Sequence, residues 1–132
     1  MGYQWPVRKK SFNKYNAVRS NGFGSKLESA VYQLLLLRQK AGEIKDINQQ
    51  VSVDLTCGIR WKVDFSYYEK RLKKTAWVEA KGCETERYRM CLKLWRGGHG
   101  PGTLLIYKGS YVKPTLVDIV VPRALERIYT RK

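Results

Sequence analysis

The sequence predicts a single α+β domain, and three observations support this prediction. With 132 residues, the chain is long enough for one hydrophobic core but not for two. Residues 25–42 repeat apolar side chains at the helical period. Three further segments alternate apolar and polar side chains as strands do, namely residues 47–55, 60–68 and 75–81. The predicted order is a helix, a three-stranded antiparallel meander, a second helix, a further strand and a C-terminal helix.

The first helix has recognisable start and stop signals. Ser25 is expected to cap its N-terminus, and Glu28, three residues later, has the spacing of a capping box. The Ala41-Gly42 pair is expected to end the helix. Before it, residues 1–24 are basic, contain no acid and are expected to form an arm outside the domain at 25–132. This arm is interpreted either as a solvated tail or as a segment that contacts phosphate or a partner subunit.

The three strands are expected to be joined by a turn at Cys57-Gly58 and by the basic loop at 69–74. Residues 84–96 then predict the second helix, with acids in its first turn, where the helix dipole favours them. The glycine-rich segment "RGGHGPG" breaks that helix, and "TLLIY" at 103–107 predicts a short buried strand. A final helix is expected to begin near Pro122.

The charge of the chain indicates a polyanionic partner. Lysine and arginine number 26 against 11 acids, which gives a net charge of +15. Nucleic acid is the simplest such partner, and an anionic membrane surface is the competing one. No apolar run is long enough to span a bilayer, and no apolar signal segment is visible at the N-terminus, so we expect a cytoplasmic protein. Three scattered cysteines and one histidine do not have the spacing of a zinc site, and we expect reduced thiols.

The strongest chemical signal lies on the second predicted hairpin. If residues 60–68 and 75–81 pair symmetrically about their loop, Asp64 lies opposite Glu79, and Lys81 is on the same face. Two opposed carboxylates repel, and a divalent cation between them removes the conflict. Mg²⁺ is the expected ion and Mn²⁺ its substitute, because hard cations bind carboxylate oxygens together with water and phosphate. The alternative is a solvated strand face on which lysines neutralise the two acids.

This D-x14-E-x-K pattern, together with the segments "GSKLES", "VDF" and "VEAKG", resembles the PD-(D/E)xK nuclease superfamily. Within it, the pattern is similar to small phage-encoded endonucleases such as phage Holliday-junction resolvases. The resemblance covers residues 20–110 and implies a restriction-endonuclease-like core. It implies that Asp64 is the first metal ligand, although Val63 replaces the usual proline. It further implies that Glu79 is the second ligand and Lys81 the catalytic lysine.

Two further roles follow from the same resemblance. The backbone carbonyl of Ala80 is expected to bind the metal, and Glu28 matches a helix-borne catalytic glutamate at the edge of the site. The capping box also explains Glu28 without catalysis, so both interpretations stay open.

Gln49 or Gln50 is expected either to reach the site or to form a polar strand end, and His99 is expected to be a loop residue.

Contacts with DNA are expected from the arm and from side chains around the site. The alternative is that these side chains are solvated surface charge. The predicted DNA-binding residues are Arg8, Lys9, Lys10, Lys14, Arg19, Gln50, Lys62, Arg71, Lys73, Lys74, Lys93 and Arg96.

The function expected from these observations is a magnesium-dependent DNA endonuclease. The resemblance implies hydrolysis by water that leaves a 5′-phosphate and a 3′-hydroxyl. It also implies specificity for branched DNA, a role in DNA recombination and, for a bacteriophage protein, the host cytoplasm. Paired cuts in a junction favour a homodimer with two sites. The alternatives are a nicking or repair nuclease that is not specific for junctions, a basic nucleic-acid-binding module without catalysis and, third, a protein of anionic membrane surfaces.

Overall fold

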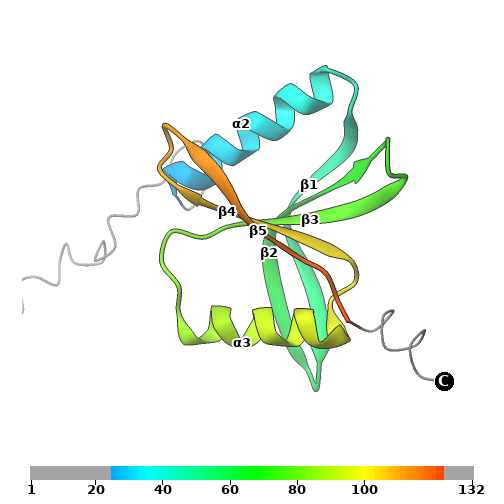
Figure 1. The fold of residues 1–132 in the computed structure, drawn as a ribbon, viewed down its shortest axis with the longest axis vertical. Coiled ribbons are helices and arrows are strands. Elements are labelled where there is room, and N and C mark those ends of the chain that lie inside the picture. Colours follow the sequence, from blue (N-terminus) through cyan, green and yellow to red (C-terminus); the bar gives the residue numbers. More distant parts are fainter. Residues whose placement is uncertain (1–24, 124–132) are drawn as a thin grey trace, which may run out of the picture.

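The structure is a computed structural model of the chain, and it describes residues 25–123. The predicted arm at 1–24 and the residues of the predicted final helix from 124 onwards lie outside these described residues. Figure 1 shows two helices packed against one sheet. The elements are α2 (Lys26–Lys40), β1 (Ile44–Thr56), β2 (Ile59–Glu69), β3 (Lys74–Ala80), α3 (Glu86–Leu94), the π-helical turn η1 (Trp95–His99), β4 (Thr103–Gly109) and β5 (Pro114–Val120).

The strands form a five-stranded mixed sheet in the order β1-β2-β3-β4-β5. All neighbours are antiparallel except β3 and β4, which are parallel because α3 and η1 form the crossover between them. The predicted α+β class and the antiparallel meander are confirmed. The predicted element list was wrong in omitting β5. The sequence "PTLVDIV" hides this strand because its apolar run lacks a regular alternation, and the run is mostly exposed at the edge of the sheet.

Helix α2 begins and ends where the sequence predicts. Ser25 accepts a hydrogen bond from the backbone N–H of Glu28 at 3.1 Å, which satisfies one of the free donors in the first turn. After Ala41, Gly42 adopts a left-handed backbone with φ of 83°. At the same end, Arg38 binds Glu43 and Glu69, each at 2.7 Å, and so ties the helix to the turn before β1 and to the end of β2.

Helix α3 is shorter than its predicted range of 84–96, because Thr85 caps it by accepting from the N–H of Tyr88 at 3.1 Å. The chain then continues through η1 rather than stopping at the first glycine. Trp95 fixes this turn, since its ring is fully buried and its indole N–H donates to the carbonyl of Gly102 at 2.7 Å. Gly98, with φ of 119°, supplies the backbone reversal.

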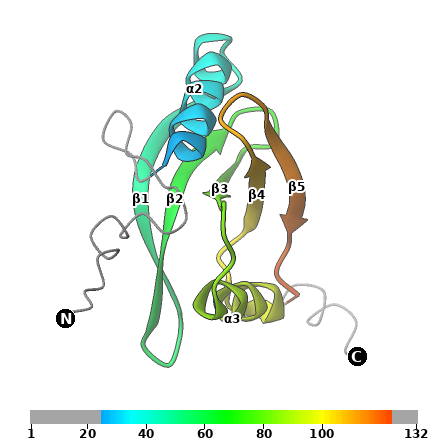
Figure 2. The same cartoon turned by 90° about the vertical axis from the view of Figure 1, so that its left-hand side faces the viewer.

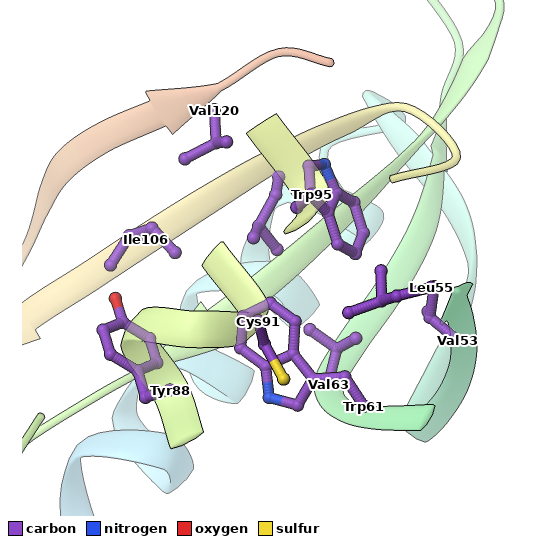
Figure 3. Close-up of a cluster of buried hydrophobic side chains, with 10 residues drawn as sticks. Val53, Leu55, Trp61, Val63, Tyr88, Cys91, Trp95, Ile106 and Val120 are labelled. Atoms are coloured by element: carbon purple, nitrogen blue, oxygen red, sulfur yellow. The ribbon is translucent and has the colours of Figure 1, made fainter. Parts of the chain in front are cut away.

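Two hydrophobic clusters stabilise the domain. The α2 core contains Leu27, Val31, Leu35, Ile44, Phe65, Tyr67, Ala76 and Val78. The α3 core, shown in Figure 3, contains Val53, Leu55, Trp61, Val63, Tyr88, Cys91, Trp95, Leu104, Ile106 and Val120. Alternate residues of β4 enter different cores, because Leu104 and Ile106 belong to the α3 core while Leu105 and Tyr107 pack on the α2 core. The two helices therefore cover opposite faces of the sheet at β4.

Strands β2 and β3 pair only from Phe65–Val78 to Glu69–Lys74, and beyond Phe65 they separate. Strand β2 continues with β1 as far as Ile59, while β3 continues with β4 as far as Ala80. We call the point of separation the fork. Figure 2 shows the β1–β2 ribbon leaving the other strands there, with α3 at that end of the sheet and α2 at the other.

The fork changes one prediction about the faces of β2. The alternation predicted for residues 60–68 places the odd-numbered side chains from Trp61 to Tyr67 on one face of the strand, yet these side chains divide between the two cores. A two-stranded ribbon twists more than a wide sheet, so its apolar face turns from α2 towards α3 beyond the fork. On β3, Trp77 is likewise packed, since its ring meets Trp95 edge-on at 5.8 Å. Within residues 25–123, neither helix is long and apolar enough to cross a membrane.

The glycines of the turn after α3 allow a matched test of this packing. A Cβ atom at Gly100 would overlap the buried Trp95 ring, whereas a Cβ at Gly97 would meet nothing within 4 Å. We expect Gly100→Ala to lower the free energy of unfolding by about 1–3 kcal/mol through overpacking. Gly97→Ala should change the free energy of unfolding by less than about 0.5 kcal/mol. Urea unfolding of both variants measures the difference, and equal stabilities would contradict the packing of Trp95.

Candidate active site

Polar side chains of three neighbouring strands, two of them acidic, lie in one row at the fork. Residues Gln49 and Val51 of β1 pair with Phe65 and Val63 of β2, so Gln50 lies across from Asp64. The β2–β3 register, continued by one residue past Phe65–Val78, brings Asp64 beside Glu79. The predicted adjacency of the two carboxylates across the hairpin is therefore found in the structure.

The two carboxylates also replace the hydrogen bonds that the separating strands lose. The backbone N–H of Asp64 donates to Oε1 of Glu79 at 3.3 Å. The backbone N–H of Ala80 donates to Oδ2 of Asp64 at 2.8 Å. Because buried N–H groups need an acceptor, these contacts fix both side chains in the opening between the strands.

Glu79 and Asp64 are buried, with exposures of 4% and 9%, and Glu28 of α2 is 7% exposed. Burial, followed by the charge of Glu28, raises the pKa of Asp64 from 3.8 to about 7. Burial, followed by the charge of Asp64, raises the pKa of Glu79 well above its ordinary value of 4.5. Three acids thus repel one another at a site shielded from solvent, and they do so in a chain with an excess of cations.

Glu28 and Gln50 are joined directly. Nε2 of Gln50 donates to Oε2 of Glu28 at 2.8 Å. A hydrogen bond from Gln50 also favours the ionised form of Asp64 and so lowers the pKa of that carboxyl. Gln50 therefore links a carboxylate of α2 to one of β2, while the backbone of Glu28 serves the helix cap. The residue has a left-handed backbone with φ of 50°, which is unusual for a residue other than glycine.

Lys81, the residue after β3, places its ammonium group beside these acids. Nζ of Lys81 lies 3.9 Å from Oε2 of Glu79, which is an ion pair but too long for a hydrogen bond. It also lies 5.3 Å from the centroid of the Tyr88 ring on α3. Sequence reasoning missed Tyr88, because its closeness to Lys81 depends on how α3 docks and not on any motif.

Five of the predicted DNA-binding residues lie in three exposed places within the described chain. Lys62 is exposed on the β1–β2 ribbon beyond the fork, and Lys93 is exposed on α3. The side chains of Arg71, Lys73 and Lys74 are exposed at the β2–β3 turn, and Lys74 is five residues along β3 from Glu79, or about 16 Å.

Two further predicted residues have contacts of their own. Arg96 forms an ion pair with Asp118 at 2.9 Å, and the amide of Gln50 faces the carboxylates. His99 is exposed, but it is the last residue of the π-helical turn η1 and not the loop residue that was expected. The residues of the arm, which are Arg8, Lys9, Lys10, Lys14 and Arg19, lie outside the described residues.

The donor set at the fork suits a hard divalent cation such as Mg²⁺, because it consists of carboxylate oxygens whose mutual repulsion a cation relieves. Between residues 25 and 123, however, no three Asp, Glu, His or Cys side chains form a ready-made group around one point. A cation here would therefore use Asp64 and Glu79, with the backbone carbonyl of Ala80 as the expected third ligand, and complete its coordination with water and a phosphate oxygen.

Comparisons of the chain with protein-family models, with curated proteins and with solved structures gave no match. What this chain can do chemically is therefore inferred from the side chains at the fork.

The raised pKa of Asp64 predicts how stability changes with pH in the absence of divalent ions. Between pH 3.8 and about 7, the unfolded chain loses this proton while the folded protein keeps it. Folding therefore becomes less favourable as the pH rises, by on the order of 2–4 kcal/mol by pH 8. Asp64→Asn removes the titration, so its stability should exceed that of the wild type increasingly across this window. Urea unfolding in a chelating buffer at several pH values measures the difference.

Asp54→Asn is the matched control for this experiment. Asp54 lies on the same ribbon and pairs with Arg60, but its side chain is 78% exposed. Its variant should follow the wild-type pH dependence. Parallel curves for the wild type and Asp64→Asn would show that the carboxyl of Asp64 titrates normally.

Proposed function

We propose that this protein is a metal-dependent DNA endonuclease of the PD-(D/E)xK type. One observation carries the proposal: Asp64 and Glu79 are buried side by side at the fork, with raised pKa values and with the ammonium group of Lys81 next to them. Structural needs account poorly for such a set, because burying two mutually repelling carboxylates is costly even when backbone N–H groups donate to them. Perturbed acids beside a lysine are typical of sites that bind metal and phosphate.

Asp64 and Glu79 would hold the cation, and their existing backbone hydrogen bonds keep both side chains oriented before it binds. The carbonyl of Ala80 remains the third proposed ligand. When bound, Mg²⁺ supplies charge stabilisation to the phosphate and lowers the pKa of a water molecule. Binding would also convert both acids to their ionised forms, since a cation favours the charged state.

Lys81 would contact the phosphate. Within the described chain, its ammonium donates no hydrogen bond, and its side chain is 26% exposed. Its N–H groups are thus available to a phosphate oxygen, where they would stabilise the negative charge that develops as the bond breaks. Gln50 would orient the carboxylate of Glu28, the residue proposed to stand at the edge of the site.

The proposed substrate is DNA, and branched DNA in particular, as for a Holliday-junction resolvase. The net charge of +15 supports a nucleic-acid substrate, because phosphate contacts release condensed counterions. A junction needs two cuts, which a homodimer supplies economically. The likeness in motif to phage resolvases supports junctions over linear DNA, and a nicking or repair enzyme is the variant of this proposal that acts on other DNA structures.

A basic nucleic-acid-binding module without catalysis is the second candidate. The observation in its favour is that Asp64 and Glu79 already accept backbone N–H groups at the fork. If both acids are protonated near neutral pH, they explain the geometry of the strands without any metal. The two candidates differ in whether a divalent cation binds at the fork.

Metal binding therefore separates these candidates. We expect Mn²⁺ to bind the wild type at pH 7.5 with release of protons, because bound carboxylates must be ionised. Glu79→Gln should lose this binding, whereas Asp54→Asn should keep it. Isothermal titration calorimetry in two buffers of different ionisation enthalpy measures both the affinity and the proton release. An absence of binding to the wild type would favour the module without catalysis.

Cleavage tests the chemistry itself. With Mg²⁺ or Mn²⁺, the wild type should cut a synthetic four-way junction in preference to linear duplex DNA of the same sequence. Asp64→Asn and Lys81→Ala should each lower the cleavage rate at least a hundredfold, since each removes a group that acts on the transition state. Asp54→Asn again serves as the control. Full activity in both site variants would exclude these residues from the mechanism, and equal cutting of linear DNA would exclude junction specificity.

A further inference from the structure

We propose that Tyr88 is a positioning residue for Lys81, and that the face of its ring holds the ammonium group at the fork. This inference rests on the proposed function and assigns a second residue to the lysine of that site. It begins from the distance of 5.3 Å between Nζ of Lys81 and the centroid of the Tyr88 ring, which is within the range of a cation–π contact.

The ring is held rigidly, which a positioning role requires. Tyr88 is 3% exposed and lies edge-on to Trp61 with ring centroids 6.0 Å apart. Its backbone N–H is fixed by Thr85 at the start of α3. Figure 3 shows the ring at one side of the α3 core, with its hydroxyl next to Ile106. The ring therefore has little freedom to move away from Lys81.

An aromatic face restrains a lysine differently from a carboxylate. Lysine has a long flexible side chain, and ordering it costs conformational entropy. A carboxylate that orders the chain consumes N–H donors of the ammonium, whereas a ring face attracts the cation and leaves those donors unused. In this site, Glu79 is too far away at 3.9 Å for a hydrogen bond, and the ammonium lies over the Tyr88 ring at 5.3 Å from its centroid. The donors of Lys81 thus stay available for phosphate.

The ring rather than the hydroxyl carries this effect. Among the described residues, the hydroxyl of Tyr88 has no hydrogen-bond partner. Burial and the charges of Glu84, Glu79 and Asp118 raise the pKa of Tyr88 to about 12, although Arg96 opposes them. The phenol is therefore neutral under working conditions and forms no ion pair with Lys81. Phenylalanine at position 88 should therefore preserve the restraint on Lys81, whereas leucine should lose it.

The first test is structural and needs no DNA or metal. In the full-length, metal-free protein, the ε-methylene protons of Lys81 should be shifted upfield in the NMR spectrum, because they lie near the ring face. The shift should persist in Tyr88→Phe and disappear in Tyr88→Leu. Normal Lys81 shifts in the wild type would overturn the proposal, and this result does not depend on whether Tyr88→Leu folds.

The second test is a double-mutant cycle on cleavage of the four-way junction with Mg²⁺. Tyr88→Phe should keep kcat within about twofold, and Tyr88→Leu should lower kcat about tenfold with little change in KM. In a Lys81→Ala background, Tyr88→Leu should have no further effect, because the residue acts through the lysine. An equal loss in both backgrounds would indicate a purely structural role and overturn the proposal.

A matched aromatic control is present away from the fork, where an exposed lysine lies over a half-buried tyrosine. Lys45 lies 5.2 Å from the ring centroid of Tyr68, so Tyr68→Leu breaks a similar contact elsewhere and should leave kcat unchanged. The two proposals fail in different ways. A wild type that cuts no DNA overturns the proposed function and any catalytic role of Tyr88 with it. A wild type that cuts DNA without the Lys81 shift overturns the positioning role alone.

Discussion

The electrostatic repulsion between Asp64 and Glu79 is the constraint on which the rest of the site depends. The sheet forces the two acids together, because the register of β2 and β3 places them side by side and burial keeps water away. Two features of the structure reduce the free-energy cost of this repulsion. The raised pKa values keep protons on Asp64 and Glu79 to higher pH, and backbone N–H groups donate hydrogen bonds to both carboxyl groups. A cation would be a third way, and it is the one on which the proposed nuclease function depends.

The fork connects this site to the folding of the whole domain. Separation of β2 from β3 frees backbone donors for the carboxylates, and it also lets α3 pack beneath the β1–β2 ribbon. Arg87 of α3 donates to the carbonyl of Arg60 on that ribbon at 2.5 Å, which adds a polar tie between them. The same packing brings the Tyr88 ring to Lys81. The opening in the sheet, the second hydrophobic core and the position of the lysine therefore have a common origin.

Local patterns predicted much of this arrangement. The cap at Ser25 and the turn at Cys57-Gly58 depend on neighbouring residues, so the sequence displays them. Hairpin symmetry was sufficient to place Asp64 beside Glu79. Other features depend on packing between segments that are far apart in the sequence, and local patterns do not predict them. These features are the exposed strand β5, the division of Trp61 and Phe65 between two cores, and the contact of Tyr88 with Lys81. Gln50 was predicted only in part. One of Gln49 and Gln50 was a candidate to reach the site, but the hydrogen bond from the amide of Gln50 to Glu28 was not predicted.

The left-handed backbone at Gln50 implies a compromise between the stability of the fold and the role of this side chain in the site. A residue with a Cβ atom pays about 1 kcal/mol or more for that conformation, and glycine would adopt it freely. Selection for thermal stability alone would favour glycine at this position. Glycine would remove the side-chain amide of Gln50, which lies between Glu28 and Asp64. Selecting variants only for a higher melting temperature would therefore favour loss of the Gln50 amide from the site. A stabilising substitution at position 50 is one that a protein engineer should avoid.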